Sequence, residues 1–238
     1  MMRVLPIAEH HSEEVGTVNA SPADTPPGVT PFYRFAVFVS RPIVKGLYRL
    51  DVSGLEHVPK ASGFVVAANH TSNLDPWPLA IALEPRQLHF MAKSELWKPG
   101  LRTLLRWGGA FPVRRGEGDV EAMNTAVRLC HEGRVMAMFP EGTRRSKGLR
   151  KKHQPRPHSG TARIALAAGV PILPAAIRGM DRLSRFGPLR VAFGPPVPVE
   201  DLAEFDARSA SQEATRRLWA EIQRLEAELG GDSAERAG

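Results

Sequence analysis

The chain beyond residue 49 alternates short apolar runs with stretches of helical periodicity. Strands that alternate with helices are typical of a parallel sheet, because each parallel strand needs a crossover to reach the next one. The pattern therefore predicts an α/β fold: a single domain with a mostly parallel central sheet flanked by helices. The predicted strands are residues 47–52, 64–68, 88–92, 134–139, 171–177 and 189–193.

Three stretches between and after these runs carry an apolar stripe at helical spacing. The last stripe covers fewer than two heptads, so it indicates packing on the core rather than a coiled-coil partner. The first stripe consists of Val120, Met123, Val127 and Cys130; the second, which Gly169 is expected to stop, contains Ile164 and Leu166; the third consists of Leu218, Ile222, Leu225 and Leu229.

Residues 31–50 form an apolar segment with interleaved arginines and a lysine. Its longest run without a charge, residues 35–40, is far shorter than the ~20 residues that a membrane-spanning helix needs. Aromatic and aliphatic residues mixed with cations are typical of a helix that lies in a membrane interface. This predicts an N-terminal amphipathic, membrane-associating helix. A first helix that covers the core explains the same pattern equally well, and both interpretations stay open.

The 238 residues are 42% hydrophobic and 24% charged, which suits one globular domain with a substantial core. Residues 1–30 contain prolines and small polar residues without apolar periodicity, so they are predicted to be a disordered leader. They lack the basic-then-apolar order of a signal peptide. The predicted domain covers residues 31–230, and residues 231–238 are predicted to be a disordered tail.

The balance of charge favours anionic partners. The net charge is +7 and the sequence pI about 10.1, so the surface should attract nucleic acid, a phosphorylated substrate or an acidic membrane leaflet. Residues 144–156 hold seven lysines and arginines and no acidic residue, yet they contain no aromatic residue for stacking on bases. The chain also shows no known nucleic-acid-binding pattern. We therefore expect phosphate groups of lipids or substrates, and no nucleic acid, as partners.

Cys130 is the only cysteine, so an intrachain disulfide is impossible and a reducing compartment fits the composition. It falls in a helical apolar pattern, which indicates packing rather than nucleophilic chemistry. The histidines show no zinc-ligand spacing with it, so no metal site is predicted.

His70 and Asp75 follow the predicted strand 64–68 and are the first candidates for chemistry. Five residues turn a helix by about 500°, and a strand would send them to opposite faces, so they can meet only across a turn. An imidazole with a carboxylate on one nitrogen is a general base with a fixed tautomer. The substrate would then supply the hydroxyl group that is activated. A buried structural histidine, and an aspartate that caps a helix starting at Pro76, remain the alternatives.

Two arginine-containing segments are candidates for binding an anion. Residues 108–115, GGAFPVRR, deliver Arg114 at the end of a short apolar segment, and the planar fork of arginine suits a phosphate. Residues 139–146, FPEGTRRS, combine the flexible backbone of Gly142 with the hydroxyl of Thr143 and the charge of Arg144. Taken alone, each segment could equally be a solvated surface loop.

Four blocks in order resemble the glycerolipid acyltransferase family, whose best-known members are 1-acyl-glycerol-3-phosphate (lysophosphatidic acid) acyltransferases. The resemblance covers residues 34–193. One block alone would be weak evidence, but four with fitting spacing are specific. The blocks are NHTSNLD at 69–75, GGAFPVR at 108–114, FPEGTRRS at 139–146 and VPILPAAI at 170–177.

The resemblance implies a mechanism. His70 would take the proton from the acceptor's hydroxyl group, with Asp75 orienting it, and the oxygen would attack the thioester of acyl-CoA or acyl-carrier protein. No metal and no other cofactor is implied. The last block would shape an acyl channel, unless it is simply a buried strand. The residues implied to hold the acceptor's phosphate are Lys93, Arg114, Glu141, Gly142, Thr143 and Arg144.

The product of that reaction would be phosphatidic acid, made in phospholipid biosynthesis by a peripheral protein on the cytoplasmic face of an anionic membrane. Pro112 and Val113 stand where many family members have isoleucine and aspartate, so the choice of acceptor stays open. Glycerol-3-phosphate, another lysophospholipid or a glycolipid are the alternatives, and a non-catalytic basic binding protein is a third hypothesis. The basic stretch 148–159 has no assigned role.

Overall fold

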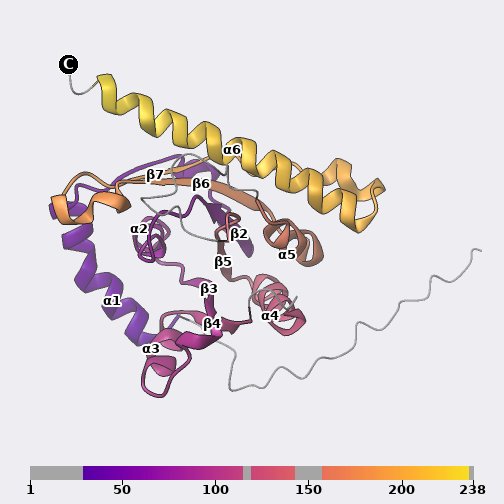
Figure 1. Ribbon diagram of the computed structural model, residues 1–238, viewed down its shortest axis with the longest axis horizontal. Coiled ribbons are helices and arrows are strands. Elements are labelled where there is room, and N and C mark those ends of the chain that lie inside the picture. The colour runs from indigo at the N-terminus through magenta and orange to yellow at the C-terminus, as the bar shows by residue number, and fades with distance from the viewer. Residues whose placement is uncertain (1–28, 115–118, 143–156, 236–238) are drawn as a thin grey trace, which may run out of the picture.

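A single mixed sheet forms the centre of the molecule in residues 29–114, 119–142 and 157–235, which are the parts that the computed structural model describes (Figure 1). Its strand order is β1-β7-β6-β2-β5-β3-β4. The strands are β1 (Asp51–Ser53), β2 (Phe64–Ala68), β3 (Leu88–Lys93), β4 (Ala110–Val113), β5 (Val135–Met138), β6 (Ile172–Arg178) and β7 (Arg190–Phe193).

Five neighbouring strands, β6, β2, β5, β3 and β4, run parallel to one another. β7 pairs antiparallel with β6, and the edge strand β1 follows the direction of β7. The predicted α/β domain with a mostly parallel sheet is therefore confirmed. The first predicted strand, residues 47–52, is placed too early, because Ile43–Leu47 form a π-helical turn and the strand begins at Asp51. β4 is an additional strand that the run of apolar residues was too short to predict.

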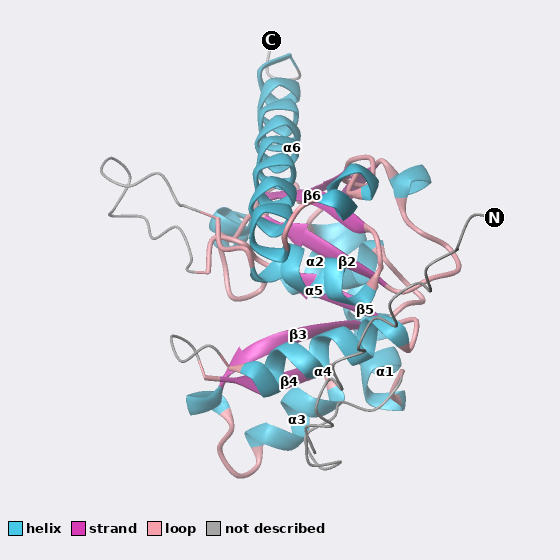
Figure 2. Ribbon diagram, turned by 90° about the vertical axis from the view of Figure 1, so that its right-hand side faces the viewer, coloured by secondary structure: helices cyan, strands magenta, loops and turns pink. Residues whose placement is uncertain are grey.

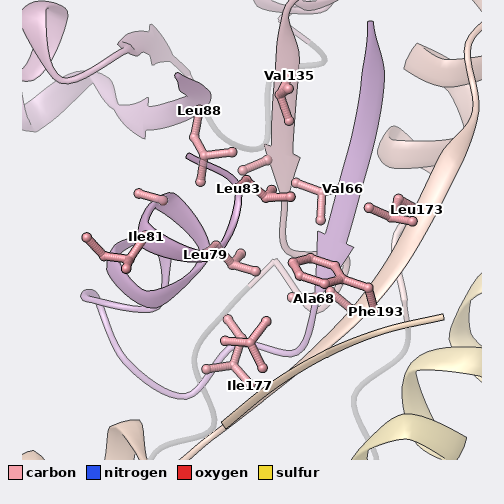
Figure 3. Close-up of a cluster of buried hydrophobic side chains, with 14 of the residues drawn as sticks. Val66, Ala68, Leu79, Ile81, Leu83, Leu88, Val135, Leu173, Ile177 and Phe193 are labelled. Carbon is pink, nitrogen blue, oxygen red and sulfur yellow. The ribbon is translucent and has the colours of Figure 1, made fainter. Parts of the chain in front are cut away.

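Helices cover both faces of the sheet. Successive side chains of β2 point to opposite faces, and both sets are apolar, so each face needs a covering layer. Phe64, Val66 and Ala68 join the cluster under α1 (Pro31–Pro42) and α2 (Pro76–Ala82). Figure 3 shows this cluster, with Leu79 of α2 and Val66 of β2 directed toward one another. Val65 and Ala67 pack on the other side, against residues of α4 (Val120–His131), α5 (Gly160–Ala168) and α6 (Ala207–Glu235).

α1 covers the core with one face and exposes the other. Its residues Tyr33 and Val37 are buried, as is Val44 of the following turn, whereas Phe35 and Phe38 are 66% and 73% exposed. Thr30 begins the helix by accepting a hydrogen bond from the N–H of Tyr33, so the ordered domain starts before residue 31. The structure thus confirms the core-covering interpretation and leaves an exposed apolar face. Residues 1–28 of the predicted leader lie outside the described part of the chain.

The predicted stripe of α4 is confirmed in part, because Cys130 is buried and Met123 and Val127 pack against the same core cluster. Val120 is instead 63% exposed, and the helix also buries small residues, Ala122 and Ala126, against the sheet and α5. Small alanines let the two helices approach closely, which a pattern of large apolar residues does not reveal. Gly169 ends α5 with a positive φ of 59°, as predicted.

α6 is longer than predicted. Its stripe from Leu218 to Leu229 is buried as expected, but the helix continues to Glu235, past residue 231 where the predicted tail begins. Gly230 lies against the guanidinium of Arg178, where an added Cβ would come within 2.8 Å of Nη1. A tail beginning at residue 231 is therefore wrong, and residues 236–238 lie outside the described parts.

Candidate active site

Candidate residues follow four parallel strands, so they share one edge of the sheet. His70 comes after β2, Lys93 ends β3, Arg114 follows β4 and Glu141 follows β5. The carboxyl ends of parallel strands are where α/β proteins place ligands. At about 4.8 Å per strand, β4 lies roughly 14 Å from β2, a distance that long side chains and a substrate can bridge.

His70 and Asp75 meet across the turn that joins β2 to α2. Nδ1 of the imidazole lies 2.8 Å from Oδ2 of the carboxylate, and the Asp75 side chain is fully buried. Because a carboxylate only accepts hydrogen bonds, Nδ1 carries the proton and Nε2 keeps its lone pair. The contact predicted from the sequence is confirmed, and it leaves Nε2 as the basic nitrogen.

The carboxylate of Asp75 organises the whole turn. It accepts hydrogen bonds from the backbone N–H groups of Thr71 (2.7 Å) and Ser72 (2.8 Å) and from the hydroxyl of Thr71 (3.2 Å). Asp75 precedes α2, but its side chain is engaged in this turn instead of capping the helix. Asp75 therefore occupies the position before Pro76 that the capping interpretation gave it, but its side chain makes no capping hydrogen bond to α2.

Phe139, after β5, holds the plane of the imidazole. The two rings are stacked with centroids 4.4 Å apart and planes 24° apart. The His70 side chain remains 13% exposed. The base is therefore fixed on its Nδ1 side and on one face, with limited access for a substrate.

Two contacts between distant parts of the chain anchor the base to the sheet. Oε1 of the buried Glu141 accepts a hydrogen bond from the backbone N–H of His70, at 3.2 Å. The side chain of Asn69 donates to the carbonyl of Ile177 in β6 at 2.9 Å and accepts from its N–H at 2.7 Å. These bonds tie the loop after β2 to the ends of both neighbouring strands. They give Glu141 a positioning contact that the sequence did not indicate.

Gly142 closes a tight turn after β5. Its N–H donates to the carbonyl of Phe139 at 3.0 Å, so this N–H is already used inside the turn. Its φ is +66°, and an added Cβ would come within 2.7 Å of the ring of His158, a neighbour that sequence reasoning missed. A phosphate-binding role for this glycine stays a prediction. Thr143 and Arg144 lie outside the described residues, as do residues 148–156 of the basic stretch.

Arg114 lies at the mouth of a hollow of about 260 Å³ at the end of β4. Its N–H donates to Oδ2 of Asp119 at 2.8 Å, and its Nε lies 3.7 Å from the same oxygen. Burial opposes ionisation of Asp119, but the N–H groups of Arg114 and Ala122 and the nearby guanidinium outweigh it and lower its pKa. The guanidinium stays 62% exposed, and Lys93 is exposed on the neighbouring strand.

A second hollow, of about 340 Å³, is almost entirely apolar. It lies between α1, α2 and β3, and it includes Pro76 and Trp77, directly after Asp75. Residues 170–177, expected to shape an acyl channel, form the buried strand β6 instead. The apolar hollow is thus formed by segments of α1, α2 and β3, and not by the segment that the sequence indicated.

Among the described residues, no group of three or more histidine, cysteine, aspartate and glutamate side chains is arranged to hold a metal ion. The predicted absence of metals and cofactors stays a prediction. Cys130 is buried in the core, which raises the pKa of its thiol to about 12 and agrees with a packing role.

A fully buried carboxylate paired with an imidazole at the carboxyl edge of an α/β sheet is an arrangement that can act as a general base toward a hydroxyl group. Comparison with known proteins identifies the family. The sequence matches the model of the family described as Acyltransferase over residues 49–178, more than half of the chain. The chain belongs to this family and is an O-acyltransferase, as the four sequence blocks predicted.

Individual relatives agree with this assignment. A 1-acyl-sn-glycerol-3-phosphate acyltransferase of Bacillus subtilis is 29% identical over 201 residues, covering 83% of this chain and 98% of that protein. A Streptococcus pneumoniae protein of the same name is 29% identical over 69% of this chain and 61% of its own length. The predicted place in phospholipid biosynthesis agrees with these names. The crystal structure of the 1-acyl-sn-glycerophosphate (LPA) acyltransferase PlsC from Thermotoga maritima has the same fold, with a TM-score of 0.57, 24% identity and coverage of 82% and 88% of the two chains.

Proposed function

We propose that this O-acyltransferase moves a fatty acyl group from acyl-CoA or acyl-carrier protein to the free hydroxyl of 1-acyl-glycerol-3-phosphate, giving phosphatidic acid. The observation that carries the proposal is the 2.8 Å contact between Nδ1 of His70 and Oδ2 of Asp75. The names of the relatives support the acceptor. Either donor presents the same thioester to the base.

In the reaction, Nε2 of His70 takes the proton of the acceptor's hydroxyl while the oxygen attacks the thioester carbonyl carbon. A new C–O ester bond forms, the C–S bond breaks, and the departing thiolate receives the proton from the imidazolium. Asp75 keeps Nδ1–H directed toward itself and stabilises the positive imidazolium. The proton balance closes without a second titrating group.

The acceptor's phosphate would lie toward β3 and β4, where cations follow the strands. Lys93 and Arg114 are both exposed there, and the predicted partners Gly142, Thr143 and Arg144 would approach from the loop after β5. Charge-assisted hydrogen bonds to phosphate suit the fork of arginine. The carboxylate of Glu141 would serve this site indirectly, through its hydrogen bond to the backbone of His70.

The apolar hollow between α1 and α2 is the proposed position of an acyl chain. It adjoins the segment that carries Asp75, and its lining is almost free of polar atoms. An acyl chain placed there would present its carbonyl carbon near the base. Its wall includes Phe32, Ala36 and Val37 of α1, so this helix would link the acyl site to the membrane surface.

We also propose that α1 holds the protein peripherally on the cytoplasmic face of an anionic membrane. Phe35, Phe38 and Val39 form its exposed apolar side, and Arg34 and Arg41, two helical turns apart, flank that side together. None of the helices in the described parts of the chain combines the length and apolar character needed to cross a bilayer.

The test of the reaction is His70→Ala in an assay with labelled acyl-CoA and a panel of lysolipids. Loss of a general base should lower kcat by about 10²–10⁴-fold while acyl-donor binding is retained, and Asp75→Asn should also lose much of the rate. The matched control is His131→Ala, an exposed histidine at the end of α4. Near-normal turnover by His70→Ala would disprove the mechanism. A wild-type preference for glycerol-3-phosphate or a glycolipid would instead change the acceptor.

A further inference from the structure

α3 (Leu101–Trp107) is an apolar helix that the fold leaves unburied. Four of its seven residues are leucine or tryptophan, and none of the seven is buried. Leu101, Leu104 and Trp107 are 40%, 47% and 47% exposed. Apolar side chains gathered on an exposed helix are typical of a surface that meets another apolar surface.

α3 lies next to the exposed helix α1. The rings of Phe32 and Trp107 have centroids 5.9 Å apart, and the hydroxyl of Thr30 donates to the carbonyl of Trp107 at 2.9 Å. Both helices lie at the same end of the molecule in Figures 1 and 2. The exposed apolar residues of α3 therefore continue the exposed face of α1.

The charges around these two helices have one predominant sign. Residues 31–50 contain no acidic residue, and Glu95 is the only one in residues 94–107. Glu84 lies beside α1 and pairs with Arg41 at 3.3 Å, which leaves the other cations in excess. Such an excess of cations around apolar side chains complements an anionic lipid surface. It disfavours a second copy of the chain as the occupant, because pairing identical faces would bring like charges together. The cations are Arg34, Arg41, Lys45, Arg49, Lys98, Arg102 and Arg106.

We propose that α3 is a second lipid-contacting element, and that α1 and α3 together form the surface on which the protein lies on an anionic bilayer. The inference rests on the proposed membrane location and extends it from α1 to a second, separate segment, Leu101–Trp107. Contact through α1 alone would let the protein roll about the axis of that helix. Contact through a second helix fixes the orientation, and with it the direction in which the carboxyl edge of the sheet faces the lipids.

A fluorescent probe at single positions tests the contact. Leu104→Cys, Phe38→Cys and the control Phe205→Cys would each be labelled with an environment-sensitive nitrobenzoxadiazole group. Cys130 is buried, and its thiol pKa is raised to about 12, so it should stay unlabelled. Phe205 is 51% exposed and lies just before α6, whose first turns are on the opposite side of the molecule from α3 in Figure 1. With phosphatidylglycerol–phosphatidylcholine vesicles, emission should shift to shorter wavelength at positions 104 and 38 and stay unchanged at 205.

A charge-insertion variant provides the second measurement. Leu101→Glu/Leu104→Glu should lower partitioning into the same vesicles by about tenfold or more, because two leucines lose their contact with the bilayer. Phe205→Glu should bind as the wild type does. Acyl transfer to a detergent-dispersed acceptor should be unchanged in both variants, which separates membrane contact from the reaction itself.

Three outcomes would overturn the proposal. A probe at position 104 that stays in water while the probe at 38 enters lipid would exclude α3 and leave the membrane role of α1 intact. If neither probe enters lipid, the membrane location fails as well, while activity on the dispersed acceptor still tests the proposed reaction. A dimer in light scattering that Leu101→Glu/Leu104→Glu converts to a monomer would assign the face to a second copy of the chain.

Discussion

Glu141 is the single residue whose contact departs most from its expected role. The sequence resemblance placed it among the phosphate ligands, whereas its carboxylate accepts a hydrogen bond from the backbone of His70. A carboxylate next to a phosphate would repel it. A carboxylate hydrogen-bonded to the backbone of His70 instead holds the loop after β2 in place. A misplacement of about 1 Å at a reacting group can cost roughly 10²-fold in rate.

Substitution of Glu141 distinguishes the two roles. Glu141→Ala should lower kcat by about tenfold or more with little change in the acceptor's KM, whereas Glu141→Gln should retain most activity because its amide oxygen still accepts. The exposed Glu56→Ala serves as the control. Steady-state kinetics with varied acceptor give both constants. A raised KM at unchanged kcat would support direct contact with the acceptor and contradict positioning.

Arg114 and its partner Asp119 give two further predictions at the residue scale. Arg114→Ala should raise the acceptor's KM by about tenfold, since a charge-assisted hydrogen bond contributes roughly 1.5–3 kcal/mol and this guanidinium starts largely exposed. Arg114→Lys should rescue only part of the loss, because an ammonium group cannot bind phosphate in a fork. Equal use of phosphorylated and neutral acceptors by the wild type would contradict this role.

The pKa of Asp119 predicts a pH dependence of stability. Its pKa is lowered in the folded chain, so the ionised group stabilises the fold at pH values above the unfolded pKa, about 4. This contribution is lost as the pH falls through the folded pKa. Asp119→Asn should therefore be less stable than the wild type at pH 7, and the difference should shrink below pH 4. Urea unfolding at several pH values measures it, and a difference that grows in acid would disprove the assignment.

At the scale of elements, Arg86 fastens the loops at the amino edge of the sheet. Its guanidinium donates to the carbonyls of Pro59, Ser62 and Gly133 at 3.0, 2.8 and 2.6 Å, and it lies over the ring of Phe64 at 5.0 Å. These loops precede β2 and β5, the strands that carry His70 and Glu141 at their other ends. Arg86 therefore links segments that the strand ladder alone does not join.

Arg86→Ala should destabilise the protein by at least about 2 kcal/mol, because several hydrogen bonds from a charged group are lost together. Arg86→Lys should recover only part, since one ammonium group cannot reach three carbonyls in the same geometry. Urea unfolding measures the change, with the exposed Arg182→Ala as the control. The acceptor's KM should stay unchanged, and a large KM effect would place Arg86 in the site instead.

The elements also show how far the sequence predicts the site. His70 and Asp75 belong to one short turn, so the sequence could show that they are able to meet there, and the family resemblance implied that they do. The bonds from Glu141 to His70 and from Asn69 to Ile177 join residues 71 and 108 positions apart. They depend on the register in which β2 pairs with β5 and β6, which no local pattern determines. The prediction for α4 missed its buried alanines for a related reason, because their burial depends on the neighbouring helix α5.

At the scale of the whole molecule, the excess of seven positive charges acts together with the apolar face. Binding to anionic vesicles should weaken several-fold between 0.1 and 0.5 M NaCl, because the range of charge interactions falls below its value of about 10 Å at 0.1 M. Part of the binding should persist, since burial of apolar side chains is not screened. Cosedimentation measures it, with neutral vesicles as a salt-independent control. Complete release at 0.5 M would show that charge alone holds the protein.

The vesicle-binding test uses the full chain because residues 31–50 contribute side chains to the hydrophobic core. Tyr33, Val37 and Val44 are buried under the sheet, so removing residues 31–50 would uncover apolar side chains along with any lipid-binding face. A chain beginning at Asp51 should aggregate instead of reporting on the membrane. Substitution of exposed residues such as Phe38 leaves these buried contacts in place.

The bond between Asn69 and Ile177 also sets an order of events during synthesis. His70 and Asp75 are synthesised by residue 75, but the strand that holds their loop through Asn69 is complete only at Arg178. At 5–20 residues per second, the nascent chain carries an unclamped imidazole for roughly 5 to 20 s. The loop that carries His70 and Asp75 can therefore reach its final position only late in translation, after β6 has been synthesised.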